Sequence, residues 1–181
     1  LEKPNEAIWF VGDSVIKFSD DSKFIANRAA RADVLKGYIP EITGVSGNMY
    51  RYKKAKGEIL SKAVSIPIFK KLLQYSKDFW TIEVLDPEQK MKFQNDCLMF
   101  YREKTFERVE LFYKNFNKSD GTESINGVEM PALKSLLDSV DWEYLADGLA
   151  GRFHGDFHFE NILYSKDDGC FTFLDWRQDF G

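Results

Sequence analysis

The residues of this chain that could do chemistry are concentrated in residues 154–181, which read HGDFHFENILYSKDDGCFTFLDWRQDFG. This stretch holds both histidines of the chain, a group of aspartates and Asn161. Carboxylate oxygens are preferred ligands of Mg²⁺, and a well-placed carboxylate can also orient or deprotonate a hydroxyl group. The aspartates therefore divide into candidates for metal binding and candidates for proton transfer.

The spacing between Asp156 and Asn161 is typical of phosphoryl transfer. That reaction needs a carboxylate for the attacking hydroxyl, oxygen ligands that hold Mg²⁺ against the phosphates, and a Lys that neutralises phosphate charge. Kinases carry the first two parts on one loop with the pattern H-x-D-x-x-x-x-N. Residues 154–161 (HGDFHFEN) match this pattern.

A β-hairpin after this loop would bring Asp175 beside Asn161. Residues 162–174 (ILYSKDDGCFTFL) contain two β-runs around an Asp-Asp-Gly turn, and Asp175 stands where the returning strand ends. Asp179 belongs to a terminal DFG sequence that resembles the magnesium motif of protein kinases. No strand would place Asp179, so we interpret Asp175 as the metal ligand and Asp179 as a solvated loop residue.

The first 60 residues predict a small mixed lobe of β-β-α-β order. Residues 8–18 (IWFVGDSVIKF) indicate a hairpin because β-forming residues flank a Gly-Asp turn, and Lys17 stands near the end of its second strand. Residues 21–37 indicate a helix, since apolar residues recur at a helical period and a Gly can end it. Residues 47–60 indicate a strand, a polar link and the start of a second helix.

The region up to residue 150 predicts mainly helices. Residues 66–76 are amphipathic, and Asp86-Pro87 opens a helical segment that runs to about residue 114. Residues 117–127 predict an exposed loop, and residues 131–150 one or two helices. A stripe along the long segment is expected to pack in a core, and it comprises Phe93, Cys97, Phe100, Tyr101, Phe106, Val109 and Phe112.

Composition excludes several functional classes. The formal net charge of −4 over 181 residues argues against a nucleic-acid-binding protein. The two cysteines, Cys97 and Cys170, form no CxxC pattern and indicate reduced thiols in a cytoplasmic protein. No apolar run approaches the ~20 residues of a membrane helix, and no signal peptide is visible. The chain begins on Leu and stops after a dense motif, so we expect a fragment cut at both ends; its oligomeric state is not predicted.

The sequences HGDFHFENIL and FLDWR resemble the aminoglycoside phosphotransferase and choline kinase family, which consists of small-molecule kinases. Members typically show H-G-D-x-H-x-x-N followed by a strand that ends in (I/L)-D-(W/F/Y). The resemblance is very specific over residues 152–177, moderate over residues 8–60 and weak between them. It implies an α+β, protein-kinase-like two-lobe fold, with a small β-rich N-terminal lobe in residues 1–56 and a mainly helical C-terminal lobe in residues 57–181, apparently truncated at both ends.

The resemblance also implies roles for individual residues. Asp156 would be the catalytic carboxylate, and Asn161 and Asp175 would bind Mg²⁺. Lys17 would contact the phosphates of ATP or GTP. The backbone of the link between the lobes would contact the adenine, and the residues of that link are Lys54, Ala55 and Lys56.

The chain departs from the family pattern in three respects. Only one strand precedes Lys17, so part of the hairpin that covers the phosphates is missing. The helix at 21–37 contains no Glu to pair with Lys17, and Asp33 and Asn27 are the nearest substitutes. The helices that shape much of the acceptor pocket in family members are absent after Gly181, so we expect this chain alone to be a poor catalyst.

Three further residues near the loop are candidates for supporting roles. His154 and His158 are four residues apart, as in some zinc sites, but no third His or nearby Cys completes such a site. We expect His154 to support the loop by hydrogen bonding, whereas His158 either lies near the acceptor or is structural. Arg177 either contacts phosphate or acceptor, or forms a structural salt bridge.

Together these observations predict a phosphotransferase that moves the γ-phosphate of ATP or GTP to a hydroxyl group of a small molecule. The acceptor would be an aminoglycoside, choline, a sugar or a similar molecule, and Mg²⁺ would be the cofactor. Two alternatives stay open. One is a metal-dependent phosphoesterase that uses the HGDFH sequence as ligands, and the other is a non-catalytic nucleotide-binding module. Magnesium-dependent ATP binding separates the phosphoesterase from the other two, and acceptor-stimulated ADP release separates the kinase from the module.

Replacing each candidate metal ligand by Ala tests the interpretation of the hairpin. We predict that Asp175→Ala loses magnesium-dependent nucleotide binding, because a ligand is removed, and that Asp179→Ala retains it. Titration of both variants with Mg-ATP measures the difference. The reverse order of affinities would identify the terminal DFG as the metal motif.

Overall fold

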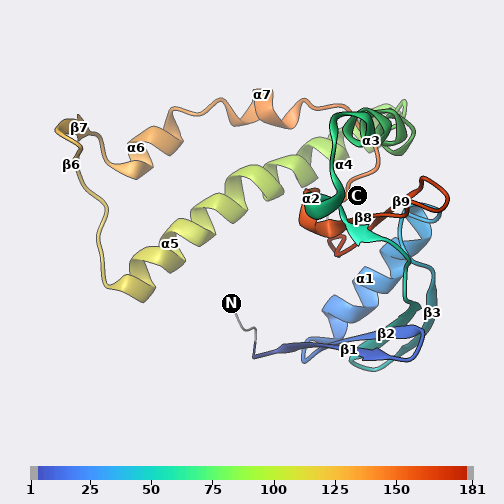
Figure 1. Cartoon of the computed structure of the whole chain (residues 1–181). Helices are drawn as coiled ribbons and strands as arrows, with labels where there is room; N and C mark the ends of the chain where they lie inside the picture. The colour runs from blue at the N-terminus through green and yellow to red at the C-terminus, as the bar shows by residue number, and fades with distance from the viewer. Residues whose placement is uncertain (1–3, 179–181) are drawn as a thin grey trace. The chain divides into compact units, whose positions relative to one another are not determined.

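Residues 4–178 are described by a computed structural model of the chain, which combines antiparallel sheets with helices in an α+β fold, as predicted (Figure 1). The chain divides into two compact units. The described part of the first unit comprises residues 4–82 and 151–178, and the second unit comprises residues 83–150. The predicted division into lobes at residue 56 is a different partition, and it stays a prediction.

The described part of the first unit contains two sheets and three α-helices. In chain order its elements are β1 (Glu6–Val11), β2 (Ser14–Ser19), α1 (Ser22–Val34), β3 (Ile42–Ser46), β4 (Met49–Lys53), β5 (Glu58–Ile59), α2 (Leu60–Ala63), α3 (Ile66–Phe79), the 3₁₀ turn η2 (Phe159–Asn161), β8 (Ile162–Tyr164) and β9 (Phe171–Phe173). The strand order is β1-β2-β4-β3 in the larger sheet and β5-β8-β9 in the smaller one.

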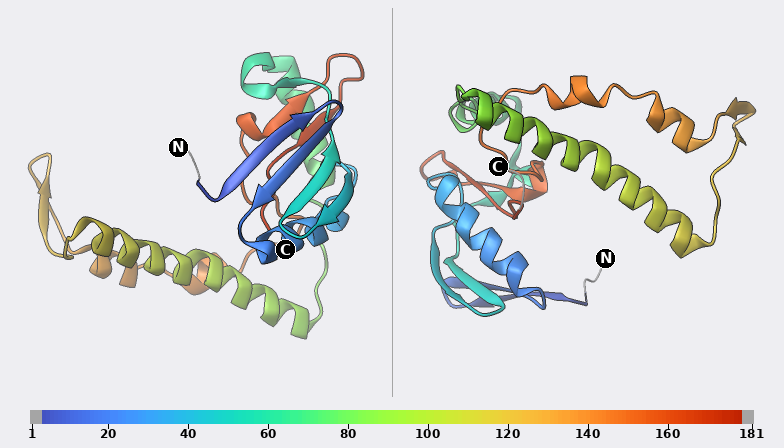
Figure 2. Two further views of the ribbon diagram at one scale, coloured as in Figure 1. Left: turned by 90° about the horizontal axis from the view of Figure 1, so that it is seen from below. Right: turned by 180° about the vertical axis from the view of Figure 1, so that it is seen from behind.

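The larger sheet confirms the predicted N-terminal hairpin, in which β1 pairs with β2 around Gly12-Asp13 (Figure 2). Strand β3 was not predicted, because Gly44 interrupts its run of β-forming residues and the register with β4 shifts between Ile42 and Gly44. The order of the first elements is therefore β-β-α-β-β, with one more strand than predicted.

One face of the larger sheet is covered by α1. Burial alternates along β2, so that Val15, Lys17 and Ser19 are buried on one face, and Tyr50 and Tyr52 are buried on neighbouring β4. Helix α1 contacts β2, β3 and β4, and its buried apolar residues are Ile25, Ala32 and, directly after its end, Leu35. Lys17 therefore lies on a buried face although it is a charged residue.

The smaller sheet carries the hairpin that was predicted after the HGDFHFEN loop. Strands β8 and β9 pair antiparallel with Ile162 opposite Phe173. Phe173 is 0% exposed and lies at the centre of an aromatic cluster. Its ring centroid is 4.9 to 6.2 Å from those of four aromatic side chains, namely Tyr38, Tyr75, Phe79 and Phe157.

The second unit is built around one long helical segment. Its elements are α4 (Pro87–Leu98), the π-helical turn η1 (Met99–Glu103), α5 (Lys104–Phe116), β6 (Glu123–Ile125), β7 (Val128–Met130), α6 (Leu133–Asp138) and α7 (Trp142–Ala146). Asp86 caps α4 in a capping box with Gln89, which confirms the predicted start of this segment.

One prediction for the second unit was wrong, and another was right only in part. The aromatic stripe was expected in a core, but α4, η1 and α5 contain no buried residue, and Phe112 is 46% exposed. The periodicity predicts which residues share a helix face and does not show what covers that face. Residues 117–127 are exposed as predicted, but part of this segment forms β6, which pairs with β7 around a turn at Asn126-Gly127. None of the described helices combines the length and the apolar character needed to cross a membrane.

Removing the central ring of the aromatic cluster should destabilise the first unit. We predict that Phe173→Ala lowers the free energy of unfolding by about 3–5 kcal/mol, because a large buried side chain leaves a cavity. Phe10→Ala is the matched control, since Phe10 is 69% exposed, and we expect it to cost less than about 1 kcal/mol. Chemical denaturation measures both values, and equal losses would contradict the assignment of Phe173 to the core.

Candidate functional site

The first turn of the HGDFHFEN loop is fixed by a buried His154. The backbone N–H of Asp156 donates to His154 Nδ1 over 3.3 Å, and the imidazole packs edge-on against the rings of Phe157 and Phe173. Burial lowers the pKa of His154 to about 4, an effect that the nearby Asp156 carboxylate partly opposes. The ring is therefore neutral at pH 7 with Nδ1 as an acceptor, in agreement with the predicted supporting role.

Arg177 closes over the same turn. Gly155 has a φ of +84°, and a Cβ atom there would lie 2.6 Å from the Arg177 side chain. The guanidinium Nε donates to the Gly155 carbonyl over 3.0 Å, and the Arg177 backbone N–H donates to the His154 carbonyl over 2.9 Å. Of the two roles predicted for Arg177, these backbone contacts favour the structural one.

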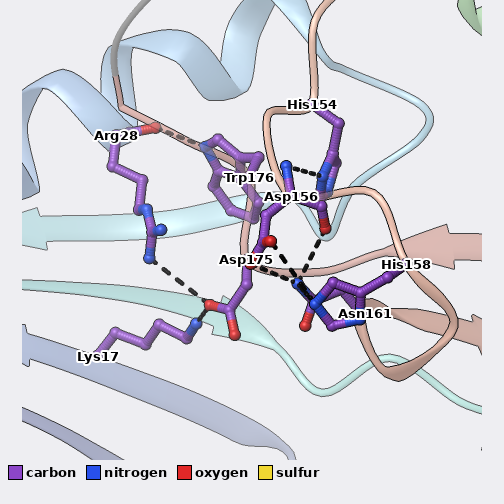
Figure 3. Close-up of polar contacts among 8 residues, drawn as sticks. All are labelled: Lys17, Arg28, His154, Asp156, His158, Asn161, Asp175 and Trp176. Carbon is purple, nitrogen blue, oxygen red and sulfur yellow. Dashed lines mark hydrogen bonds and ion pairs between the residues drawn. The ribbon is translucent and has the colours of Figure 1, made fainter. Parts of the chain in front are cut away.

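The two polar residues of the kinase-like spacing contact each other directly. Asn161 Nδ2 donates to the backbone carbonyl and to carboxylate Oδ2 of Asp156, each over 3.0 Å (Figure 3). His158 Nε2 lies 3.1 Å from the same amide nitrogen and 3.6 Å from Asp156 Oδ1. The five-residue spacing thus closes a small loop, with Asp156, His158 and Asn161 forming one half-exposed polar cluster.

Asp175 lies next to this cluster, where the hairpin was predicted to place it. The backbone N–H of Leu174 donates to the Asn161 carbonyl over 2.7 Å, which continues the β8–β9 pairing to the residue before Asp175. Asp175 has a φ of +57°. Residues other than Gly, Asn and Asp rarely adopt this left-handed backbone conformation. The next residue, Trp176, is 1% exposed, and its Nε1 donates to the Arg28 carbonyl over 2.9 Å. This hydrogen bond holds the chain in place directly after Asp175.

The Asp175 carboxylate contacts two cationic side chains from different elements. Lys17 Nζ, from β2, forms an ion pair with Asp175 Oδ1, and Arg28 Nη1, from α1, lies 3.5 Å from the same oxygen (Figure 3). The Lys17 and Arg28 side chains are each 11% exposed, and that of Asp175 is 39% exposed. Segments far apart in the sequence therefore meet at one carboxylate oxygen.

The acidic partner that the resemblance implies for Lys17 does not come from α1. Asp33 and Asn27, the nearest substitutes, are both exposed. Arg28 of α1 reaches the site, and this role was not predicted from the sequence. Its position was a usable signal, because Arg28 falls on the same helix face as Ile25 and Ala32 and thus places a charge within an apolar stripe.

A cavity of about 330 Å³ lies at the Lys17 side of this arrangement. Its apolar wall includes Ile8, Phe18 and Phe24. Its polar lining consists of Glu6, Lys17, Arg28, Tyr50, Asp156 and Asp175. Burial raises the pKa of Tyr50, and the positive charge of Arg28 opposes part of that rise. The cavity therefore combines two cations with carboxylates of the predicted site.

Several predicted positions of residues 4–178 do not line this cavity, and besides the link at 54–56 these are His154, His158, Asn161 and Arg177. Lys54, Ala55 and Lys56 link β4 to β5 without regular structure and are absent from the cavity lining. The Lys54 backbone N–H donates to the Asp13 carbonyl over 2.7 Å, and its ammonium lies 5.8 Å from the Phe10 ring. An adenine contact at 54–56 stays a prediction, and Asp179 lies outside the described residues.

Asn161 and Asp175 offer oxygen atoms of the kind that a Mg²⁺ ion would need as ligands. Asn161 commits its amide nitrogen to Asp156, so Oδ1 is the amide atom left to act as a ligand. Asp175 uses Oδ1 for the two cations and has a second carboxylate oxygen. Mg²⁺ sites in kinases typically use one or two carboxylates together with phosphate and water oxygens. Asn161 and Asp175 are the residues that would hold the ion.

The depressed pKa of His154 predicts a pH-dependent stability. The unfolded chain takes up a proton at this ring below pH 6.5, whereas the folded chain resists protonation down to about pH 4. His154 therefore stabilises the fold above pH 6.5, and about 3 kcal/mol of this stability is lost as the pH falls toward 4.

His154→Gln should remove this dependence, whereas His158→Gln, at a half-exposed ring, should keep it. Urea unfolding of both variants and of the unmodified protein between pH 4 and 8 measures the slopes. Parallel curves for all three proteins would show that the burial of His154 has no such effect.

Comparisons of the chain with models of known protein families, with curated proteins and with solved structures each found no match.

Proposed function

We propose that this chain binds a magnesium nucleotide and transfers its terminal phosphoryl group to a hydroxyl group of a small molecule. One observation carries the proposal: Lys17 of the N-terminal sheet forms an ion pair with Asp175, next to the Asp156–Asn161 pair. The parts that phosphoryl transfer requires were predicted in separate segments. Lys17, Asp156 and Asp175 line one cavity, and Asn161 donates to Asp156 beside it, which is the arrangement that the hypothesis needs.

In this proposal Asp156 is the catalytic carboxylate. Its side chain is 52% exposed, so an acceptor can reach it, and Asn161 restrains it from the inner side through a hydrogen bond to Oδ2. The carboxylate would hold the acceptor hydroxyl in line with the phosphate and accept its proton. Lys17 would neutralise phosphate charge from the opposite side. A bound Mg²⁺ would supply charge stabilisation of the phosphate oxygens.

The proposal includes a kinase-like role for the two parts of the first unit. The sheet β1-β2-β4-β3 with α1 would form the nucleotide-covering part, and the hairpin β8–β9 with the preceding loop would form the catalytic part. The antiparallel pairings, the position of α1 against β2 and β4, and the left-handed Asp175 at the end of β9 support this assignment. Backbone strain of this kind is often found at functional sites.

The phosphoesterase alternative is less well supported by the contacts of the histidines. That alternative needs the HGDFH sequence to provide several metal ligands. His154 is 2% exposed and its Nδ1 accepts from the backbone of Asp156, so this ring is committed to its own loop. The contacts described here are equally compatible with a non-catalytic nucleotide-binding module. Acceptor-dependent ADP release is the measurement that separates this alternative from a kinase.

Neutralising Asp156 tests the proposal. We predict that Asp156→Asn lowers acceptor-dependent ADP release at least about 100-fold, because the base is lost, and changes the Mg-ATP affinity only a few-fold. Asp167→Asn is the matched control, since Asp167 is an exposed residue of the β8–β9 turn, and it should retain turnover. A panel of hydroxylated acceptors provides the assay.

Unchanged turnover in Asp156→Asn would refute the role of this carboxylate. Binding of Mg-ATP without ADP release, for every acceptor and for the unmodified protein, would favour the non-catalytic module. Release of phosphate from phosphoesters without any affinity for ATP would favour the phosphoesterase.

A further inference from the structure

The resemblance leads one to expect an acidic residue on the helix behind Lys17, but the structure places a second cation there. Arg28 lies on the face of α1 that is turned to the sheet, and its side chain is 11% exposed. It lines the same cavity as Lys17, Asp156 and Asp175. The site therefore has a different charge pattern from a Lys–Glu pair.

The guanidinium of Arg28 is held in place by its surroundings. Its Cζ lies 4.7 Å from the centroid of the Phe24 ring, a cation–π geometry, and the backbone carbonyl of Arg28 accepts from Trp176 Nε1. Within residues 4–178, Nε is buried without a hydrogen-bond partner, and the one carboxylate that Nη1 approaches is 3.5 Å away. The donors of this group are thus only partly used.

Two cations share one carboxylate oxygen at this point of the cavity. Lys17 and Arg28 each carry one positive charge, and both face the single carboxylate oxygen Oδ1 of Asp175. The carboxylates of Glu6 and Asp156 line the same cavity, so the unused Nε donor of Arg28, and not a net charge, favours an anion at this point. A partly buried cation with unused donors is stabilised by an anion, and a guanidinium suits phosphate because its planar fork can donate two parallel hydrogen bonds.

We propose that Arg28 is a second phosphate-binding residue, which together with Lys17 binds the terminal phosphate groups of a polyphosphate chain. This inference rests on the proposed function, since it concerns the same cavity. It adds a ligand class that can be tested without turnover: an inorganic polyphosphate such as tripolyphosphate should bind even though it lacks the nucleoside. Arg28 then takes the position that an acidic partner of Lys17 would otherwise occupy.

Titration calorimetry with tripolyphosphate, in magnesium-containing buffer, tests the inference. Arg28→Gln should weaken binding at least about tenfold, because a charge-assisted hydrogen bond to phosphate is lost. It should also flatten the dependence of affinity on salt, because one ionic contact fewer is screened. Arg28→Lys should recover part of the affinity, since it keeps the charge without the fork.

Arg51→Gln is the matched control. Arg51 is an exposed residue of β4 whose Nε donates to Thr43 Oγ1, and it does not line the cavity. This variant should bind tripolyphosphate as the unmodified protein does. If Arg28→Gln does not fold, as circular dichroism would reveal, Arg28→Lys decides alone: a severalfold weaker affinity supports the inference and an unchanged affinity overturns it.

The outcomes separate this inference from the proposed function. Tripolyphosphate binding that depends on Arg28, without ADP release for any acceptor, supports the phosphate site and contradicts the proposed kinase activity. Acceptor-dependent ADP release with equal tripolyphosphate affinity in Arg28→Gln and Arg51→Gln supports the kinase and overturns the role of Arg28. An unmodified protein that binds neither tripolyphosphate nor Mg-ATP overturns both.

Discussion

The ion pair between Lys17 and Asp175 is the interaction on which the described site depends. It joins a strand of the larger sheet to the end of a hairpin in the smaller one, and Arg28 of α1 approaches the same oxygen. Lys17 is 8% exposed as a residue, and burying an ammonium is costly unless a counter-charge lies close to it. Asp175 supplies that counter-charge, and its left-handed backbone turns it out of the path of β9. Removing the carboxylate would leave two nearly buried cations without their shared partner.

The surrounding contacts explain how this pair is kept in position. Trp176 connects the residue after Asp175 to the backbone of α1, and Arg31 Nη2 donates to the Phe153 carbonyl over 2.6 Å, one residue before the catalytic loop begins. Helix α1 is thus linked to both ends of the segment that carries Asp156 and Asn161. A loop that is supported at several points loses little conformational freedom when a ligand binds, which is the condition for effective positioning.

Local patterns predicted the parts of the site that belong to one segment. Alternating β-formers around Asp-Asp-Gly predicted the hairpin, and the end of its second strand correctly placed Asp175 beside Asn161. Partners from distant segments were not predictable in this way, because periodicity shows that Arg28 shares a face with Ile25 and does not show what that face meets. The aromatic stripe at Phe112 was misassigned to a core for the same reason, and β3 was missed because its short run contains Gly44.

Paramagnetic broadening in nuclear magnetic resonance tests the central claim, that these side chains form one metal–nucleotide site, most directly. Mn²⁺ replaces Mg²⁺ in kinase sites and broadens the signals of nearby nuclei. Addition of Mn-ATP to ¹⁵N-labelled protein should selectively broaden the side-chain amide signal of Asn161. The same signal should stay sharp with diamagnetic Mg-ATP in place of Mn-ATP, and Asp175→Ala should abolish the broadening at Asn161. Broadening at Asn161 that persists in Asp175→Ala, or no broadening there in the unmodified protein, would contradict the account.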